Sequence, residues 1–459
     1  MARSFFMAGR NQSSLNLYAF ALTGLSMVTM AAPVSQAARV TEVADAVDTD
    51  DPFDANVEVT LDYTYHRALI TREHTQTPAG GGDPRTLLVR ELDYSRHTAR
   101  MLPRLEVGLF RDLSLFFQWP IVVWDQQDMS YTNTTNKSNS TIERDMQSTP
   151  TVDGWTEPGQ EYGNPGVDRE QGHSDWNLQR DGNGVYRKVR VGVDYPTIGG
   201  RWSPVNNERD SSKPSIVLQL DYTPAFLLPV KQDVNDPEIN NTSTSEISYY
   251  VADAAHRFHA MVAISKRFSL LDPYFVADYY FPFSSSDGVM GFDPRHDGGF
   301  QLGMEIIPYE HTELEQKLAL DFSFLARYFS QGRDYSEVSD AFGELTYTDE
   351  FLRTGAQAAI FFKVFRFVSL DLTGTALYDT SHYLTTEQLG CDGGCPDPGL
   401  IGFIVNQFES KTIDGQVNPD IDAGERNAFF NPVLDTPGRR LRVEESIYLR
   451  IMAHIALTF

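Results

Sequence analysis

The stretch E-S-I-Y-L-R-I-M-A-H-I-A-L-T-F, residues 445–459, decides the fold class of this chain. Every second residue from Ile447 to Phe459 is apolar, and polar side chains such as Tyr448 and Arg450 stand between them. A period of two indicates a β-strand with one apolar and one polar face, because successive side chains point to opposite sides. A tilted strand crosses a membrane in roughly 9–11 residues, so this strand is long enough to span one.

The same alternation recurs upstream of this last strand. Residues 57–66 read V-E-V-T-L-D-Y-T-Y-H, with an apolar and aromatic face from Val57 to Tyr65 and a polar face from Glu58 to His66. About twelve such segments follow one another, many near or above the length of a spanning strand. They lie around residues 57–66, 104–109, 113–119, 185–193, 215–223, 257–264, 274–281, 300–308, 317–327, 352–364, 368–378 and 447–459.

The connections between these segments alternate in length. Short connections are expected at residues 111–112, 267–269, 310–312 and 366, with 200–214 as a longer member of this set. Long connections are expected at residues 71–86, 126–184, 225–255, 284–297, 330–350 and 383–441. A β-sandwich does not produce this regular alternation. The pattern predicts an all-β, transmembrane, antiparallel up-and-down β-barrel of about 12 strands, with short periplasmic turns and long extracellular loops.

The first 54 residues differ from the rest in composition. Residues 1–37 carry Arg3 and Arg10 without any acid, then an apolar run, then small residues up to Ala37, which is the pattern of a cleaved export signal. The apolar run is short and interrupted for a membrane anchor. We therefore expect a signal peptide at 1–37, an acidic periplasmic tail at 38–54 and the barrel at 55–459. The tail is interpreted as a solvated linker, with a partner-binding peptide as the alternative.

The final strand resembles the C-terminal strand of Gram-negative outer-membrane β-barrels, which ends in an aromatic residue preceded by apolar residues at alternate positions. The resemblance covers about fifteen residues, and the strand rhythm behind it extends over most of 55–459. It implies a porin-like protein of the outer membrane, with membrane lipid and lipopolysaccharide around it. It also implies that Phe459, Leu457 and Ile455 form the signal that the barrel-assembly machinery recognises.

Composition excludes several other classes of function. The formal net charge of −25 repels phosphate backbones, which excludes nucleic-acid binding. The two cysteines, Cys391 and Cys395, are too few for a multi-cysteine metal centre, and in an oxidising exterior we expect them to form a local disulfide. No metal site and no cofactor is predicted.

Charged residues on the polar faces are the candidate functional residues. In a barrel they face an enclosed wet space, where basic and acidic ladders select solutes by size and charge. The alternative is that the same charges pair across neighbouring strands and fill a narrow barrel. The predicted pore-lining residues are Arg104, Glu106, Arg190, Asp221, Arg257, Asp278, Glu305, Asp321, Arg327, Arg353, Lys363, Asp371 and Arg450.

Two further functions compete with passage of small solutes of unknown identity. An outer-membrane hydrolase needs a base near a nucleophile, often with an acid beside the base. The residues available are the inward histidines His66, His259 and His454, with Ser323 and with Asp278 or Asp321. They match no signature of a barrel enzyme, so no catalytic residue is predicted and the chain is not expected to be an enzyme. A structural or adhesive barrel acting through long loops such as 126–184 is the other alternative.

Overall fold

The structure is a computed structural model of the 459-residue chain. The residues that it describes are 38–44, 54–76, 85–136, 139–142, 185–207, 209–225, 247–249, 251–285, 292–311, 314–342, 345–365, 367–385, 412–413, 416–417, 438 and 440–459. Among them, no helix combines the length and the apolar character needed to cross a membrane.

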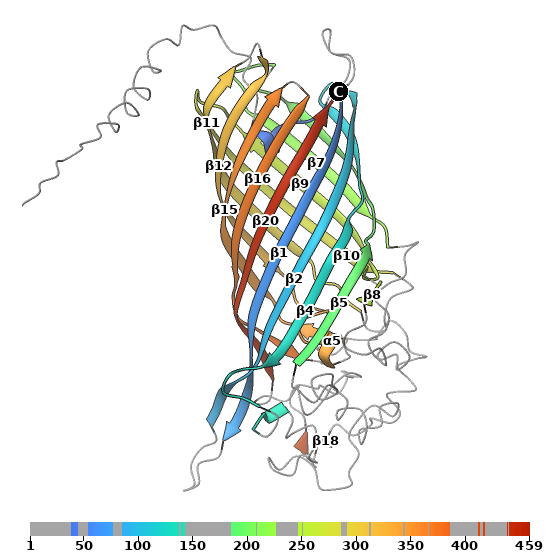
Figure 1. Cartoon of the computed structure of the whole chain (residues 1–459), viewed down its shortest axis with the longest axis vertical. Coiled ribbons are helices and arrows are strands. Elements are labelled where there is room, and N and C mark those ends of the chain that lie inside the picture. Colours follow the sequence, from blue (N-terminus) through green and yellow to red (C-terminus); the bar gives the residue numbers. More distant parts are fainter. Residues whose placement is uncertain are drawn as a thin grey trace, which may run out of the picture. The chain divides into compact units, whose positions relative to one another are not determined.

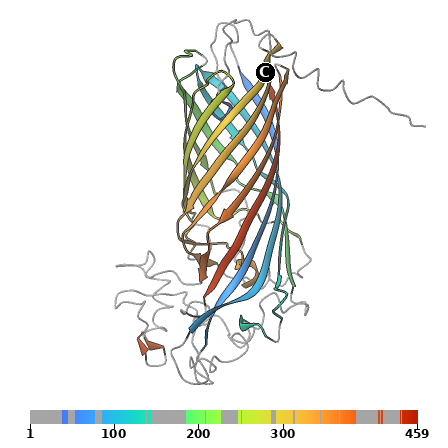
Figure 2. The same cartoon turned by 90° about the vertical axis from the view of Figure 1, so that its left-hand side faces the viewer.

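The described strands form a closed antiparallel barrel of twelve strands, which confirms the predicted fold class (Figures 1 and 2). The ring closes where the first strand pairs with the last, from Asn56 opposite Thr458 to Arg72 opposite Leu441. In ring order the strands are β1 (Ala55–Gln76), β2 (Arg85–Phe110), β3 (Leu113–Gln118) with β4 (Ile121–Tyr131), β5 (Val185–Val193) with β6 (Thr197–Val205), β7 (Ser215–Thr223), β9 (Ala255–Ser265), β10 (Leu271–Ser284), β11 (Asp297–His311), β12 (Gln316–Phe329), β15 (Phe351–Phe365), β16 (Val368–Asp379) and β20 (Leu441–Thr458).

Short elements accompany this ring. Several lie at the loop end, which is the end opposite the C-terminus in Figure 1. The short elements are η1 (Arg39–Thr41), β8 (Ile247–Ser248), β13 (Gly332–Asp334), α5 (Ser339–Phe342), β14 (Thr346–Thr348), β17 (His382–Thr385), β18 (Thr412–Ile413) and β19 (Gln416–Val417).

The two faces of the barrel wall are those that the alternation predicts. On β1 the outward Leu61 is 54% exposed, whereas its inward neighbour Asp62 is 2% exposed. Apolar side chains cover the outside, and closure pairs the backbone groups of neighbouring strands, as hydrocarbon requires. This is the architecture of an outer-membrane protein.

Two strands near the start of the ring are interrupted part-way along the wall. Trp119 and Pro120 separate β3 from β4, and proline has no N–H for the ladder, which explains the break. Residues 194–196 separate β5 from β6. The expected connection at 200–214 is therefore wrong at its start, because β6 continues the wall to Val205 and β7 begins at Ser215.

Strands β1 and β2 are longer than the sequence predicts. The expected connection at 71–86 is strand at both of its ends, because β1 runs to Gln76 and β2 begins at Arg85. The alternation fails there because Ala68 to Glu73 are all buried, so both faces of the strand are covered. Similarly, β4 runs to Tyr131, into the expected 126–184 connection.

Candidate functional site

The barrel lumen is the candidate functional site, and a ladder of arginines forms one side of it. Arg96, Arg100 and Arg104 share the inward face of β2 at intervals of four residues. Arg96 donates to both carboxylate oxygens of Asp125, at 2.6 and 2.7 Å. Arg100 donates to Asp62 at 2.8 Å, which links the ladder to β1.

Further pairs continue the ladder on the strands beside β2. Arg450 of β20 donates to the same Asp62 carboxylate at 2.8 and 3.1 Å. Arg104 donates to Glu106 at 2.5 Å and lies 3.7 Å from Glu58. These ion pairs are charge-assisted, and each arginine has a carboxylate partner in the wall.

A second network lies half-way round the ring, on β7, β9, β10, β11 and β12. Arg327 donates to Asp278 and Asp297. His259 Nδ1 is 2.7 Å from Asp221, and its Nε2 is 3.6 Å from Asp278. The ring of Tyr280 stacks on His259 with 4.0 Å between ring centroids. This side of the lumen carries more acids than bases.

Residues 38–44 cross the lumen near the end where the C-terminus lies. The η1 segment is seen in blue within the barrel in Figure 1. The backbone N–H of Arg39 donates to Glu305 at 2.9 Å, and the guanidinium of Arg39 pairs with Asp371 of β16. On the other side, Arg201 of β6 donates to the carbonyl oxygen of Val40 at 3.0 Å. The segment is thus held from opposite sides of the ring.

Apolar contacts complete the seat of this segment. Ala38 packs with Val217, Ala263, Tyr274 and Val276 in one buried cluster. The sequence predicts residues 38–54 as an acidic tail, and here 38–44 fill part of the lumen, while 45–53 lie outside the described residues.

The loop that carries α5 narrows the opposite end of the lumen. Val338 and Ala341 pack into a buried cluster with Ile70, Leu92 and Met129 on the extended strands. A buried ion pair between Asp340 of α5 and Arg190 of β5 also joins this loop to the wall. Chain segments therefore occupy both ends of the barrel interior.

The structure places the predicted pore-lining residues in ion pairs and hydrogen bonds. Arg353 and Lys363 illustrate the pattern, because Arg353 pairs with Asp379 at 2.6 Å and Lys363 lies 3.5 Å from Glu315. The partners of the predicted residues are Arg104 with Glu106, Arg190 with Asp340, Asp221 with His259, Arg257 with Asp253, Asp278 with Arg327, Glu305 with Lys317 and Arg39, Asp321 with Tyr274, Asp371 with Arg39, and Arg450 with Asp62.

Sequence reasoning missed several members of these networks. Arg96 and Arg100 share the R-x-x-x-R-x-x-x-R spacing with Arg104, and this spacing puts all three on one strand face. That signal was available in the sequence. Asp125, by contrast, lies at the edge of an expected loop, and its partners follow only from the register between β2 and β4.

The residues considered for hydrolysis are dispersed among different contacts. His66 Nε2 is 3.1 Å from Ser446 Oγ, and His454 is 3.5 Å from Glu58. Ser323 accepts a hydrogen bond from Gln301 at 2.9 Å. Within the described residues these hydrogen bonds place Ser323 and His259 in different networks.

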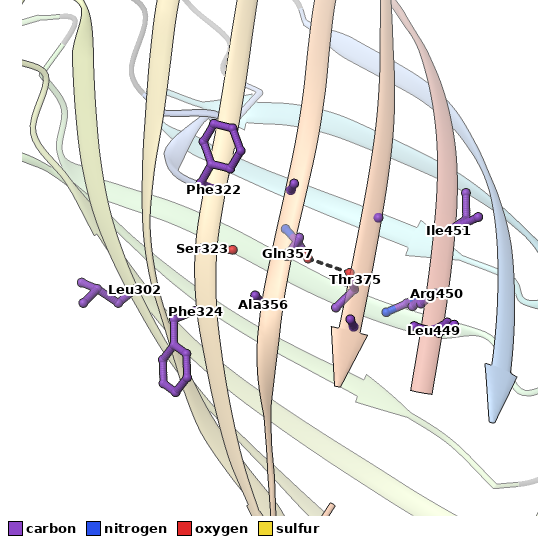
Figure 3. Close-up of a pocket in the computed structure, with 13 residues that line it drawn as sticks. Leu302, Phe322, Ser323, Phe324, Ala356, Gln357, Thr375, Leu449, Arg450 and Ile451 are labelled. Atoms are coloured by element: carbon purple, nitrogen blue, oxygen red, sulfur yellow. Dashed lines mark hydrogen bonds between the residues drawn. The ribbon is translucent and has the colours of Figure 1, made fainter. Parts of the chain in front are cut away.

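The outer wall carries a shallow apolar hollow of about 650 Å³ (Figure 3). Its floor consists of the small residues Ala356, Ala358, Gly374 and Ala376 on β15 and β16. Larger apolar side chains line its two sides, on β12 and on β20. Phe322 and Phe324 of β12 are two of them (Figure 3). The hollow faces the lipid side, so hydrocarbon chains fill it in a membrane.

On the lumen side of this hollow the wall is polar. Thr375 donates to Gln357 at 3.3 Å, which is the dashed line in Figure 3. Arg450 is a neighbour on β20 and belongs to the Asp62 network. Only the backbone and these small side chains separate lipid from lumen here.

The terminal strand has the geometry that the assembly signal needs. Ile455, Leu457 and Phe459 are outward and exposed, with Phe459 at 61%. The backbone of Phe459 pairs with Ala55 through hydrogen bonds of 2.9 and 3.1 Å, which closes the ring at its periplasmic edge. Recognition by an assembly machinery stays a prediction. The expected disulfide between Cys391 and Cys395 lies outside the described residues.

Comparison of the whole fold with solved structures finds other outer-membrane barrels. The COG4313 outer membrane channel from Pseudomonas putida F1 shares 9% identity over 88% of this chain and 96% of that chain, with a TM-score of 0.36. The outer membrane protease OmpT from Escherichia coli shares 8% over 91% and 100%, with a TM-score of 0.28. A Pseudomonas aeruginosa FadL homologue shares 8% over 88% and 90%, with a TM-score of 0.30. No family model and no curated protein sequence matches the chain.

These likenesses carry no argument about function, since every one of these TM-scores is below 0.5. The fold stands on the strand pairing of the chain itself.

Proposed function

We propose that the protein is an outer-membrane channel for the passive or selective passage of small solutes, and that it carries out no chemical step. The observation that carries the proposal is the segment 38–44 inside the lumen. A barrel whose wall side chains filled its interior would leave no room for a stretch of backbone, yet Arg39 contacts both Glu305 and Asp371 there. This contact supports an interior that is wider than the wall side chains alone would fill, as a channel requires.

The charges of the wall support the same function. The arginine ladder of β2 faces the acid-rich strands β10, β11 and β12 across the ring. Charges of opposite sign on facing walls create a transverse field in a narrow polar lumen, and this field favours small polar solutes over apolar ones. Because most of these charges have partners, we expect weak ion selectivity in the intact protein.

Conductance in a planar lipid bilayer tests the proposal. We expect discrete steps from the refolded chain 38–459, and larger steps from a chain that lacks 38–44. Removal of Arg39 leaves Glu305 and Asp371 without its positive charge, so this variant is expected to favour cations more strongly. Asp210→Asn, an exposed position in the turn at the same end of the barrel, is the control and should conduct as the wild type does.

Two results would contradict this proposal, the first its open lumen and the second the role of residues 38–44 in narrowing it. Folded protein without conductance, with and without residues 38–44, means a filled barrel. Equal conductance in both chains means that the segment does not restrict the lumen.

A further inference from the structure

A buried carboxylate lies beside the binding position of the N-terminal segment. Asp272 of β10 is 0% exposed, and among the described residues no side chain donates a hydrogen bond to either of its carboxylate oxygens. A buried charge in this condition is costly, and native structures compensate it with an ion pair. A cationic group in direct contact with Asp272 would supply that compensation.

The surroundings of Asp272 are rich in negative charge. Glu305 lies directly opposite Asp272 in the β10–β11 register, and its Oε2 atom also has no hydrogen-bond partner. Lys317 is 3.8 Å from Glu305, and it is shared with Glu42 at the same distance. Arg267 also faces this region, but both of its terminal nitrogens donate to Glu310, at 3.0 and 2.6 Å.

The backbone of the N-terminal segment points at this carboxylate. Glu305 accepts the N–H of Arg39 at 2.9 Å, and the residue opposite Glu305 is Asp272. A backbone hydrogen bond from Ala38 acts on Asp272, so the Ala38 nitrogen lies beside this carboxylate. One amide N–H carries no net charge and offers a single donor to the two carboxylate oxygens.

Ala38 is also the first residue after the expected export signal. We propose that cleavage after Ala37 creates an α-ammonium group on Ala38, and that this group forms a buried ion pair with Asp272 and locks residues 38–44 in the lumen. An ammonium group carries a positive charge and three donors and turns about the N–Cα bond, so it can donate to both carboxylate oxygens where the amide offers one neutral donor. The unprocessed chain has no charge at this nitrogen and lacks the pair.

Other contacts already hold Ala38 in place for this role. The hydroxyl group of Thr41 donates to the carbonyl oxygen of Ala38 at 2.8 Å, and the Ala38 side chain is buried among Val217, Ala263 and Tyr274. The new chain end is thus fixed by groups that do not depend on its charge. The inference concerns the chain end alone and does not depend on what passes through the lumen.

Protection of the α-amino group from acylation tests the inference. Protein exported with its own leader is folded, treated with an amine-acylating reagent, and digested, and the N-terminal peptide is quantified by mass spectrometry. We expect Ala38 as the N-terminus, with acylation on the order of 100-fold slower than in the unfolded chain, because the amine must leave its buried ion pair before it can react. Lys213, whose side chain is 60% exposed, reports reagent activity in the same sample.

Three variants test whether the ion pair with Asp272, and not burial alone, protects the α-amino group from acylation. Asp272→Asn should lose most of the protection, whereas the exposed-site control Asp210→Asn should keep it. A glycine inserted between Ala37 and Ala38 moves the ammonium group by about 3.8 Å, one residue along the chain, and should also abolish protection while Asp272 is retained. This insertion keeps the test decisive where Asp272→Asn does not fold.

An N-terminus other than Ala38 overturns the inference. So does equal acylation of the wild type and the insertion variant, because the amine then has no fixed partner. If the wild-type protein does not conduct but its α-amino group is protected from acylation, the channel proposal is refuted and the ion-pair inference stands.

Discussion

Replacement of Arg353 by methionine tests whether the lumen charges belong to a paired wall. Arg353 donates two hydrogen bonds to Asp379, at 2.6 and 2.9 Å, and its guanidinium lies 3.9 Å from the ring centroid of Tyr448. The Asp379 side chain is 1% exposed. In Arg353→Met the apolar stem is retained, but Asp379 keeps only the hydroxyl of Ser446 from this set of partners.

The expected cost follows from this geometry. Removing one partner of a buried ion pair costs about 3–5 kcal/mol. Because the Arg353 side chain is 20% exposed, water compensates Asp379 in part and we expect the lower end of the range. About 3 kcal/mol corresponds to roughly a 100-fold change in the unfolding equilibrium constant.

Urea unfolding in lipid vesicles, followed by tryptophan fluorescence, measures this cost. Arg90→Met is the matched control, because Arg90 pairs with Glu445 at 3.1 Å but both side chains are more than 60% exposed. Such a surface pair is worth about 0–1 kcal/mol. The double variant Arg353→Met with Asp379→Asn should recover much of the loss, because no buried charge is then left alone.

The result that refutes this reasoning is a cost for Arg353→Met no larger than that for Arg90→Met. The sequence alone predicts that Arg353→Glu changes ion selectivity in a barrel that still assembles. The pair with Asp379 predicts instead that two carboxylates brought together there destabilise the fold.

Three other predictions concern assembly, close packing and pH. Deletion of Phe459 removes the hydrogen bonds to Ala55 and the terminal aromatic side chain, so the amount of heat-modifiable barrel in the outer membrane should fall; normal amounts would contradict the terminal-strand argument. Gly355→Ala should destabilise the barrel by about 1–3 kcal/mol, because an added Cβ would lie 2.0 Å from the carbonyl oxygen of Ala376. Gly374→Ala on the neighbouring strand meets nothing within 4 Å and should be neutral in the same urea titration. Burial would raise the pKa of Glu73 in the extended part of β1, but hydrogen bonds from Arg440 and from the Gly438 amide outweigh this and lower it. Its contribution to stability is therefore complete above the ordinary glutamate pKa and lost as the pH falls through the lowered pKa, so the unfolding midpoints of wild type and Glu73→Gln should differ at pH 7 and converge in acid.

The faces of the strands could be predicted because lipid and lumen impose opposite demands on alternate residues. Leu61 and Asp62 differ in exposure as their positions in the pattern require. Where the two faces of a strand have the same surroundings, apolar and polar residues no longer alternate. Residues 68–73 are covered on both faces, so this part of β1 has no period-two signal, whereas β2 begins with Arg85–Leu88 exposed on both faces.

The partners of the lumen charges could not be predicted from the sequence. A single-residue change in register exchanges the faces of a strand, and a two-residue change keeps the faces but alters every cross-strand pair. The pairing of Arg353 with Asp379 thus depends on the register of β15 against β16, which the sequence does not show. The binding position of residues 38–44 depends on six strands distant in sequence, for the same reason.

The N-terminal segment also imposes an order on assembly. It is synthesised first, but its contacts come from β6, β7, β9, β10, β11 and β16, which are synthesised later. The binding position of residues 38–44 does not form until these strands have taken their places in the ring. Docking is therefore a late step whose rate depends on a nearly complete ring, and a barrel stalled before closure should present an N-terminus open to proteases.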